Sequence, residues 1–578
     1  MATTDEPERA RYLATTLPHL TLAQLVGQLF VPYLSGATPD AARVENEKRF
    51  GVATPREAIQ KFHWGGVCYF AWADNLQNPH QIAALSNGLQ TAALEGDEAQ
   101  HRRGAWRRPD GAATTSRLPL TIAIDQETGL VARLGQLVTE FPGAMALGAG
   151  REPAHTHEAY AITGRELRAL GINANYAPVA DVNVNPANPI IGVRAFSSHP
   201  DLVTVQVVAA IEGLQSAQVA ATAKHFPGHG DTSEDSHTAL PVVRHGRAQW
   251  EQIAAPPFRA AIRAGVDSIM TAHIGFPAFE PSGDPATLSH AVLTGLLRDE
   301  LGFPGVIATD SLRMAGVRQR YGDAEIAIRA LEAGADVLLD PPQPAAQYHA
   351  VVAAVTSGRL SEDRLADSVR RILSMKYDRG VIAEPYADAS LINSRVGTAD
   401  HRARAQQITD HTTTVLIDRA HLVPLPPGSV LVTGWGGTAI PVLVQKLAAA
   451  DRPVSDLVTG ARPTGTLIAQ AVSAACRHHV TIVTTGSAVN DAGQRELVAA
   501  LRETGRPLLV VALADPYDIA YLGDVPSYIA CYSSTPVALE SLVRVLNGDI
   551  GARGKLPVDI PRADSPHHTQ YPYGSGMV

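Results

Sequence analysis

Short apolar runs rich in β-branched residues alternate with longer stretches of helical periodicity between residues 21 and 380. Eight such runs lie at residues 29–33, 66–70, 120–125, 173–181, 219–224, 267–273, 306–310 and 336–340. The clearest helix follows the last run, where Ser361 is a candidate N-cap and Leu365, Val369 and Ile372 fall on one face. Eight strands separated by helices predict a (β/α)8 TIM barrel.

Polar residues stand at or next to the carboxyl ends of five of these runs. They are Asp125, Asp181, the neighbours Lys224 and His225, His273 and Asp310. Barrel enzymes build their active sites at this end, because the strand ends and the loops that follow them converge there. Solubility alone does not require polar groups at five matching positions. The pattern therefore predicts an active site at the mouth of the barrel.

A second, smaller series of alternating elements follows. Its apolar runs lie at residues 414–417, 430–433, 480–484, 508–513 and 528–531, with helical stretches such as 440–449 and 491–503 between them. This alternation predicts a parallel α/β layer domain, an α/β/α sandwich, over residues 411–578.

The two series divide the chain into four parts. We expect an N-terminal tail at residues 1–20, the barrel catalytic domain at 21–380, a linker at 381–410 and the C-terminal domain at 411–578. Within the barrel domain, residues 93–117 are charged, interrupted by Gly and Pro, and without periodicity. Such a segment is typical of a mobile surface insertion.

The composition excludes several classes of protein. The 578 residues are 45% hydrophobic and 18% charged, enough for two or three domains with sizeable cores. The formal net charge of −9 argues against a nucleic-acid partner. No apolar run approaches the roughly 20 residues that span a bilayer, and the start lacks a signal region. Because Cys68, Cys476 and Cys531 are widely separated in apolar runs, we expect reduced thiols in a cytoplasmic protein without a membrane partner.

The chemistry-bearing stretch of the chain runs from Lys224 to His237 and reads KHFPGHGDTSEDSH. Asp235 and His237 stand two residues apart, so the carboxylate can orient and polarise the imidazole; this pair is the candidate acid/base. Asp310, on a rigid strand end, is the candidate nucleophile, with a helix N-cap as its structural alternative. An acid/base and a nucleophile on opposite sides of a sugar are the arrangement for double-displacement glycoside cleavage.

This stretch resembles the signature of glycoside hydrolase family 3, in particular its β-N-acetylglucosaminidase branch. In that branch a loop with Asp-Ser-His supplies a His–Asp acid/base dyad. Further motifs match in the same order: Ile124-Asp125-Gln126-Glu127 with Arg133, Ala177-Pro178-Val179 with Asp181-Val182-Asn183, 188–196 with Arg194, Met270-Thr271-Ala272-His273, 285–289 and 309–314. The resemblance covers residues 20–380 closely and the second domain, with its motifs at 547–549 and 554–557, more loosely.

The resemblance implies a retaining exo-β-N-acetylglucosaminidase of the β-N-acetylhexosaminidase type. Such an enzyme removes non-reducing terminal GlcNAc from chitobiose or peptidoglycan-derived fragments through a covalent glycosyl-enzyme. The matching positions make Asp310 the nucleophile and His237, paired with Asp235, the acid/base. The sugar-binding positions are Asp125, Arg133, Arg194, Lys224, His225 and His273. Neither a metal nor an organic cofactor is implied.

One departure from the family pattern bears on substrate recognition. After Asp125-Gln126-Glu127 the family usually continues Gly-Gly-Arg-Val, whereas this chain continues with residues 128–131, Thr-Gly-Leu-Val. An arginine near the sugar is therefore missing at Leu130, while the residues that carry the chemistry are present.

Three alternative functions stay open at this point. A β-N-acetylglucosaminide phosphorylase could use the same scaffold, because an imidazole does not repel an incoming phosphate as a carboxylate would. A metal hydrolase would need His225, His229, Asp231 and His237 as ligands, although two glycines interrupt this loop. A non-catalytic sugar-binding protein would lack Asp310 or His237, and both are present. The leaving-group residue, and the choice between monomer and homodimer, also stay open.

Overall fold

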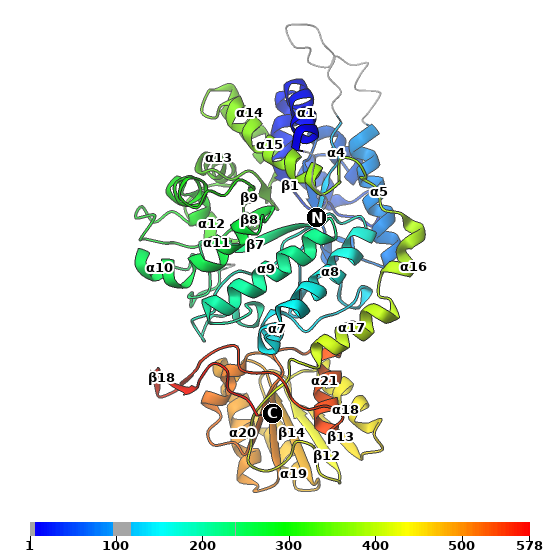
Figure 1. The fold of residues 1–578 in the computed structure, drawn as a ribbon, viewed down its shortest axis with the longest axis vertical. Helices are drawn as coiled ribbons and strands as arrows, with labels where there is room; N and C mark the ends of the chain where they lie inside the picture. The colour runs from blue at the N-terminus through cyan, green and yellow to red at the C-terminus, as the bar shows by residue number, and fades with distance from the viewer. Residues whose placement is uncertain (1–5, 96–116, 237, 578) are drawn as a thin grey trace.

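The chain folds into two α/β domains that lie end to end (Figure 1). The computed structural model describes residues 6–95, 117–236 and 238–577, so most of the predicted insertion at 93–117 lies outside the described residues. The barrel domain is drawn in blue to green, and the C-terminal domain, in yellow to red, lies below it. Within the described ranges, no helix is long and apolar enough to cross a membrane.

The N-terminal domain is built on a ring of parallel strands. Among the described residues, β2, β3, β6, β7, β8 and β9 form one sheet in that order, and β1 pairs with β10. A bridge between Ala308 and Val337 links β9 to the β10 side, and the Cys68 N–H donates to the Pro32 carbonyl at 3.0 Å, next to β1. The strands are β1 (Phe30–Val31), β2 (Gly66–Cys68), β3 (Thr121–Ile124), β6 (Ala174–Asn175), β7 (Ala220–Phe226), β8 (Ser268–Thr271), β9 (Val306–Ala308) and β10 (Leu338–Leu339). Seven of the predicted runs contain one of these strands and the run at 219–224 overlaps β7, which confirms the barrel prediction.

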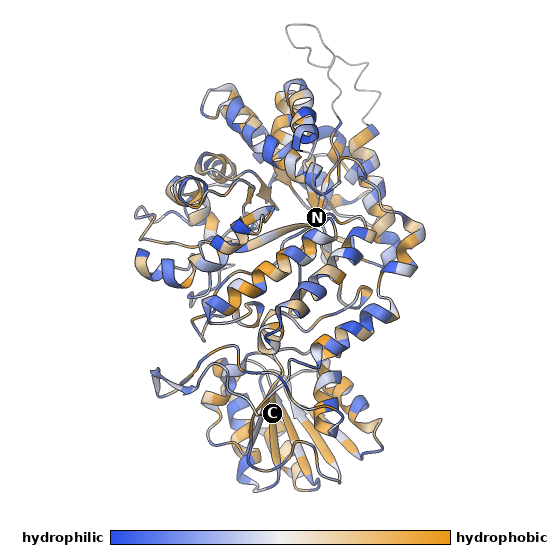
Figure 2. Ribbon diagram, in the orientation of Figure 1, coloured by the Kyte–Doolittle hydropathy of each residue, from blue (hydrophilic) through white to orange (hydrophobic). Residues whose placement is uncertain are grey.

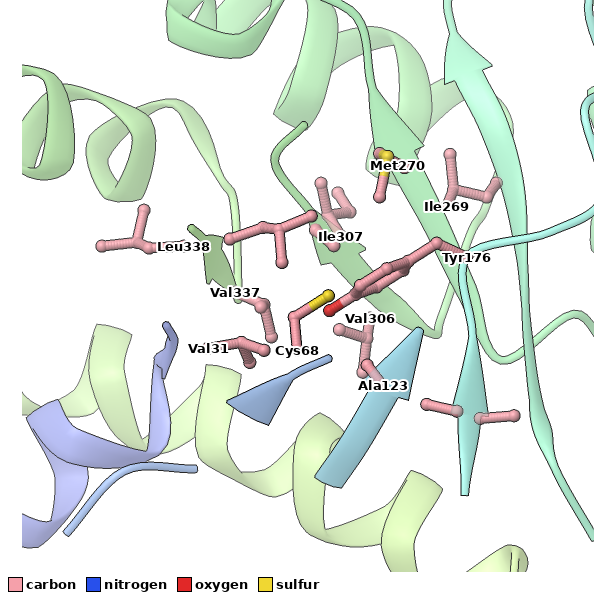
Figure 3. Close-up of a cluster of buried hydrophobic side chains, with 14 of the residues drawn as sticks. Val31, Cys68, Ala123, Tyr176, Ile269, Met270, Val306, Ile307, Val337 and Leu338 are labelled. Carbon is pink, nitrogen blue, oxygen red and sulfur yellow. The ribbon is translucent and has the colours of Figure 1, made fainter. Parts of the chain in front are cut away.

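Apolar side chains fill the interior of this ring. Figure 3 shows Cys68, Ala123, Tyr176, Met270 and Ile307, which come from different strands or strand ends and lie together. Each of them is buried. Close-packed interiors of this kind are rigid, so they hold the strand ends that carry the polar residues in fixed positions.

Helices cover the outside of the ring. The principal ones are α2 (Leu22–Gln28), α4 (Pro55–Phe62), α5 (Pro79–Glu95), α8 (Pro153–Ala169), α9 (Pro200–Ser216), α11 (Ala255–Arg263), α13 (Asp323–Ala333), α14 (Pro344–Thr356) and α15 (Glu362–Asp378). Two of them begin at side-chain caps, and the cap at α15 is the one that the sequence predicts. Thr21 and Gln24 form a capping box at α2, and the Ser361 hydroxyl accepts from the Arg364 N–H at 3.1 Å at α15.

Residues 6–19, expected to belong to a tail, form helix α1 (Glu6–Thr16) and a short 3-10 helix (Leu17–His19). The rings of Tyr12 and Tyr377 lie 5.7 Å apart, and Arg9 Nη1 lies 2.7 Å from Asp378 Oδ2. Both partners belong to the end of α15. The polar composition of the segment hid this docking, because the Arg9 contact depends on a residue 369 positions away.

Lys376, on α15, is a buried cation that joins three segments at the base of the ring. Its Nζ donates to Gln28 Oε1 at 2.9 Å, to the Gly65 carbonyl at 2.8 Å and to the Pro119 carbonyl at 2.7 Å. Gly65 directly precedes β2 and Pro119 lies two residues before β3, so this side chain holds the chain where these strands begin. Burial lowers the pKa of Lys376 to about 7, because the ammonium loses its hydration.

We expect Lys376→Met to lower the free energy of unfolding by about 1–3 kcal/mol, since buried acceptors lose their donor. The folded pKa of about 7 lies below the ordinary lysine value, so the unfolded state binds more protons between pH 7 and about 10. The free energy of unfolding of the wild type should therefore rise relative to the variant across this window. Urea unfolding at pH 7 and pH 9.5 measures both effects, with exposed Lys48→Met as the control. Equal stability of Lys376→Met and the control at both pH values would contradict the expected role.

The C-terminal domain is a sandwich around one mixed sheet. Among the described residues the strand order is β11, β16, β15, β14, β12, β13, and only the β11–β16 pair is antiparallel. The strands are β11 (Thr414–Asp418), β12 (Val430–Gly434), β13 (Val454–Val458), β14 (Val480–Thr485), β15 (Leu508–Ala512) and β16 (Ser527–Ala530). Their orange colour in Figure 2 shows apolar strands between helices such as α18 (Ala439–Ala448), α19 (Gly465–Ala475), α20 (Ala492–Glu503) and α21 (Pro536–Asn547).

Two features of this sheet differ from the sequence-based expectation of a purely parallel layer. The first strand, β11, runs antiparallel to its neighbour β16. The edge strand β13 was not expected, because its residues are only half-buried or exposed and form no apolar run. An edge strand has one free side and needs less apolar patterning than a central strand.

The segment at 381–410, expected to be a linker, contains helices α16 (Ile392–Arg395) and α17 (Ala399–Thr409). Figure 1 shows α17 running from the barrel domain toward the C-terminal domain. His401 Nδ1 lies 2.7 Å from Glu166 Oε1 of α8, and Ile408 is fully buried. The connection between the domains is therefore docked helix rather than loose chain.

Candidate active site

The structure brings the described candidate residues to one end of the barrel. Asp125, His273 and Asp310 follow the ends of β3, β8 and β9, while Lys224 and His225 occupy the last part of β7. Three others lie on loops from the same end: Arg133 after β5 (Val131–Ala132), Arg194 in a 3-10 helix (Gly192–Arg194), and Asp235 after β7. His237 lies outside the described residues. The residues at the strand ends and those on the loops after them therefore lie at the same end of the barrel.

Lys224 is the centre of an ion-pair network. Its side chain is only 3% exposed, and its Nζ lies 2.8 Å from Asp125 Oδ1 and 2.7 Å from Glu127 Oε1. Arg194 makes a bidentate pair with Glu127, with Nη2–Oε1 and Nε–Oε2 distances of 2.7 and 2.8 Å. Burial alone would raise the pKa of Glu127, but Arg194 and Lys224 outweigh it and hold that pKa well below its usual range. Glu127, Arg194 and Lys224 are therefore charged, and charged groups bind hydroxyl groups strongly.

Asp181 holds His225 in a fixed orientation. Its Oδ2 lies 2.7 Å from His225 Nδ1, and its Oδ1 accepts from the backbone N–H of His229 at 2.6 Å. The other ring nitrogen of His225, Nε2, lies 3.4 Å from Arg194 Nη2. Despite burial, the interaction and hydrogen bond with His225 and the hydrogen bond from the His229 backbone N–H lower the pKa of Asp181, so this carboxylate is ionised. Asp181 therefore fixes the imidazole so that its Nε2 faces Arg194.

Asp310 has the environment of an ionised nucleophile. Its Oδ1 accepts from the Ser311 N–H at 2.7 Å. Burial by itself would raise the pKa of Asp310. Electrostatic interactions with His225, His273 and Lys224, together with the hydrogen bond from the Ser311 N–H, outweigh burial, so the pKa of Asp310 lies below the ordinary aspartate value. The following helix α12 (Ala315–Arg318) has Met314 at its N-cap position, so Asp310 is not a helix cap.

The residues beside Asp310 form a second polar group. His273 Nδ1 lies 2.8 Å from Thr287 Oγ1, and its Nε2 lies 3.0 Å from the Ser311 carbonyl. The Ser311 hydroxyl donates to Asp340 Oδ2 at 2.8 Å, at the end of β10. Burial raises the pKa of Asp340 to about 6. His273 therefore holds Ser311, the residue that follows Asp310, in position.

The loop after β7 is folded back on itself by two histidines. His229 bridges its two ends, with Nδ1 2.8 Å from Thr232 Oγ1 and Nε2 3.1 Å from Ser236 Oγ. Burial lowers the pKa of His229 to about 4, so the ring is neutral at neutral pH and can donate from one nitrogen and accept at the other. Farther along, His245 Nε2 lies 2.6 Å from Asp231 Oδ2. These contacts give the loop that carries Asp235 a defined shape.

This loop meets the segment that follows Asp310. The Gly316 N–H donates to the Ser236 carbonyl at 3.0 Å. A Cβ on Gly316 would lie 2.9 Å from the Ala239 carbonyl oxygen, 3.0 Å from that of Ser236 and 3.1 Å from that of His273. The loop, the nucleophile's segment and the end of β8 therefore converge on one glycine with no room for a side chain.

We expect Gly316→Ala to reduce kcat/KM by about 10- to 100-fold, because a displacement of about 1 Å in an active-site loop has effects of this size. The added methyl group would push on backbone carbonyls, which cannot rotate away. Gly322→Ala is the matched control, since a Cβ on Gly322 would have no other atom within 4 Å. Kinetics together with thermal unfolding separate a local shift from a loss of fold. Wild-type kcat/KM in Gly316→Ala would show that this contact does not position the loop.

The departure from the family pattern lies on a hairpin above the site. Leu130, at the turn between β4 (Gln126–Thr128) and β5, is 75% exposed. Arg133, three residues later, places its Nη2 3.9 Å from Asp125 Oδ2. This chain therefore keeps one arginine of the hairpin beside Asp125 and has an exposed leucine at the other position.

The metal-hydrolase alternative finds no support in the described histidines. Among residues 6–95, 117–236 and 238–577, no group of three His, Cys, Asp or Glu side chains is arranged to hold a metal ion. His225 turns its ring toward Asp181 and Arg194, and His229 turns its ring toward hydroxyl groups. These nitrogens serve hydrogen bonds within the site.

The C-terminal domain reaches the loop that carries Arg194. Asn183 Nδ2 donates to Tyr517 OH at 3.2 Å. Asp515 accepts from the Val193 N–H, and a Cβ on Gly192 would lie 2.9 Å from Asp515 Oδ1. The second domain thus supports the loop before Arg194, a role that the barrel motifs alone did not indicate.

Three residues of the site were not among the sugar-binding or catalytic predictions: Glu127, Asp181 and Asp340. Glu127 and Asp181 belong to motifs quoted from the sequence, and their burial shows that they act as partners of Lys224, Arg194 and His225. Asp340 ends the eighth strand run and follows the same strand-end rule as Asp310. For Asp181 and Asp340, a carboxylate at the end of a strand run was therefore the available signal.

Known proteins match both domains. The model of the glycosyl hydrolase family 3 N-terminal domain matches residues 26–375, and that of the family 3 C-terminal domain matches residues 414–577. Beta-hexosaminidase A of Pseudoalteromonas piscicida is 36% identical over 411 residues, which are 66% of this chain and 65% of that protein. The beta-N-acetylglucosaminidase/beta-glucosidase of Cellulomonas fimi is 28% identical over 520 residues, 83% of this chain and 91% of that protein.

A solved structure extends the likeness over nearly the whole chain. The glycoside hydrolase family 3 beta-N-acetylglucosaminidase from Paenibacillus sp. str. FPU-7 superposes with a TM-score of 0.83 at 38% sequence identity. The match covers 93% of this chain and 99% of that chain. The two-domain arrangement is therefore shared with that protein.

Proposed function

Because the chain belongs to glycosyl hydrolase family 3, as its motifs predicted, we propose that it is a retaining exo-β-N-acetylglucosaminidase. The observation that carries this proposal is the convergence at Gly316. There the loop with Asp235 packs directly on the segment that follows Asp310. An acid/base loop and an ionised carboxylate that share one barrel mouth suit double displacement at a single sugar.

The proposed reaction has two steps. The Asp310 carboxylate attacks the anomeric carbon while His237, oriented by Asp235, protonates the departing glycosidic oxygen, which gives a covalent glycosyl-enzyme and the free aglycone. His237 then removes a proton from water, whose oxygen attacks the anomeric carbon and releases Asp310. Two inversions give β-GlcNAc with retained configuration. The lowered pKa of Asp310 supports its part as nucleophile.

The ion-pair network suits recognition of the terminal sugar. Asp125 and Glu127 offer charged acceptors, and Lys224, Arg194 and Arg133 offer charged donors, within one partly enclosed site. Adjacent sugar hydroxyl groups can donate to one carboxylate and accept from a neighbouring cation. Since these side chains already hold one another in place, little ordering is needed when the sugar binds.

We further propose that the substrate is a GlcNAc disaccharide of chitin or peptidoglycan origin, taken up or recycled into the cytoplasm. Free thiols at Cys68, Cys476 and Cys531 are in keeping with a reducing compartment. Cell fractionation with an antibody to the protein tests the compartment. Recovery of the protein outside the cytoplasmic fraction would overturn this part of the proposal.

Incubation of the purified protein with chitobiose and with GlcNAc–MurNAc, each with and without inorganic phosphate, tests the activity. We expect phosphate-independent release of GlcNAc, first formed as the β-anomer by NMR. GlcNAc-1-phosphate formed only when phosphate is present would instead establish the phosphorylase, which the imidazole acid/base also permits. Release of the α-anomer would exclude double displacement, and no release from either disaccharide would overturn the proposed substrate class.

A further inference from the structure

Three aromatic rings form a shelf at the mouth of the barrel, on the segments after β1 and β2. This aromatic shelf consists of Tyr33, Phe70 and Trp72. The rings of Phe70 and Trp72 are stacked at 4.9 Å, and Tyr33 meets Trp72 edge-on at 4.4 Å. Tyr33 and Phe70 are buried, whereas Trp72 is 61% exposed. Two buried rings thus hold the indole of Trp72 in place, and the rest of its surface is exposed to solvent.

The shelf touches both sides of the candidate active site. On one side, the guanidinium of Arg133 lies 5.8 Å from the Phe70 ring centre and 3.9 Å from Asp125. On the other side, Arg313, three residues after Asp310, donates to Tyr33 OH at 2.9 Å and lies 5.8 Å from the Trp72 ring centre. The exposed indole therefore stands between the sugar-binding carboxylate and the nucleophile's segment, outside the ion-pair network.

We infer that the aromatic shelf binds the leaving-group sugar of the substrate, with one face of that pyranose lying on Trp72. This inference rests on the proposed exo-β-N-acetylglucosaminidase activity. The terminal GlcNAc fills the charged network around Lys224, and the next sugar of the chain extends from it toward the rim. The aromatic shelf is the apolar surface that lies next to the ion-pair network, toward the outer edge of the barrel mouth.

The chemistry of the shelf matches a pyranose. A β-linked sugar carries its axial C–H groups on its two faces, and these weakly positive hydrogens are attracted to the negative face of an indole ring. Its hydroxyl groups point outward in the ring plane, where an arginine can donate to them. Arg313 uses one N–H for Tyr33 OH and has further donors at the edge of the shelf. An exposed apolar ring rimmed by polar groups is typical of a ligand-binding surface.

Trp72→Ala tests this inference through the size of the aglycone. We expect kcat/KM for chitobiose and for GlcNAc–MurNAc to fall about tenfold, a size typical of one lost ring contact. For 2,2,2-trifluoroethyl β-N-acetylglucosaminide, whose aglycone is too small to cover the indole, kcat/KM should change less than about twofold. Trp72→Phe, which keeps a ring, should retain most of the activity on the disaccharides. Exposed Tyr386→Ala, in the segment at 381–410, is the matched control and should behave as the wild type.

The outcomes separate the shelf from the activity itself. A fall in kcat/KM of Trp72→Ala for both disaccharides but not for the trifluoroethyl glycoside supports binding of the leaving-group sugar at the shelf. A fall for only one disaccharide identifies which leaving-group sugar is bound. Equal losses for the disaccharides and the trifluoroethyl glycoside, or unchanged kinetics for all three, would overturn it while the proposed activity stands. If the wild type releases GlcNAc from none of the three, the proposed function fails first.

Discussion

Replacing Asp310 with alanine is expected to reduce kcat/KM for GlcNAc release by about 10⁴-fold or more, as removal of a nucleophile does in other covalent mechanisms. The carboxylate is ionised because His225, His273 and Lys224 lower its pKa, and no other group in the proposed reaction attacks the anomeric carbon. The variant should also form no covalent intermediate. Intact-protein mass spectrometry after incubation with a 5-fluoro-GlcNAc donor measures this directly.

The wild type should gain the mass of one fluorinated sugar in that experiment, and Asp310→Ala should gain none. Asp299→Ala, which removes an exposed carboxylate of the same domain, is the control and should label like the wild type. A labelled Asp310→Ala protein would move the nucleophile to another residue. A stable, unlabelled wild type with measurable turnover would argue for a mechanism without a covalent intermediate.

Replacing His237 with alanine is expected to slow GlcNAc release from chitobiose by about 10²- to 10⁴-fold, the usual contribution of general acid–base catalysis. The first step needs protonation only when the leaving group is basic. An activated aryl glycoside should therefore lose much less in glycosylation than chitobiose. Steady-state and pre-steady-state kinetics on both substrates measure the difference.

Asp235→Asn tests whether the two residues act as one unit. If Asp235 works only through His237, adding Asp235→Asn to His237→Ala should have little further effect, because the pair is then already broken. His290→Ala, which removes an exposed histidine of the barrel, is the control. Equal losses for both substrates in His237→Ala would remove this imidazole from the acid role, and additive losses would mean that Asp235 acts separately.

The barrel could be predicted from the sequence because each of its strands leaves an apolar run. Strand lengths could not: the run at 173–181 contains only β6 (Ala174–Asn175), since the chain after Asn175 continues as irregular backbone toward Asp181. Helix α1 and strand β13 were not predicted, because neither leaves an apolar pattern in the sequence. Their residues are largely polar or exposed, and they are held by partners that are distant in the sequence.

The candidate site was predictable as a set of positions and less so as a set of partners. The strand-end rule located Asp125, Lys224 and Asp310. The choice of partners was hidden, because Arg194 pairs with Glu127 across 67 residues and two loops. Such a pair follows from where the loops pass in space, which periodicity does not encode. The roles of these residues follow from the resemblance to the family motifs and stay predictions.

The contacts of Tyr517 and Asp515 with the loop before Arg194 have a consequence for the modularity of this protein. The residues proposed for catalysis and sugar binding lie in the barrel domain, yet the loop before Arg194 is supported by side chains of the other domain. The two halves are then not interchangeable parts. A chimera that joins this barrel to another sandwich domain would need to carry over the supporting tyrosine and aspartate. Without them we expect a lower affinity for the sugar even though every proposed reacting group is intact.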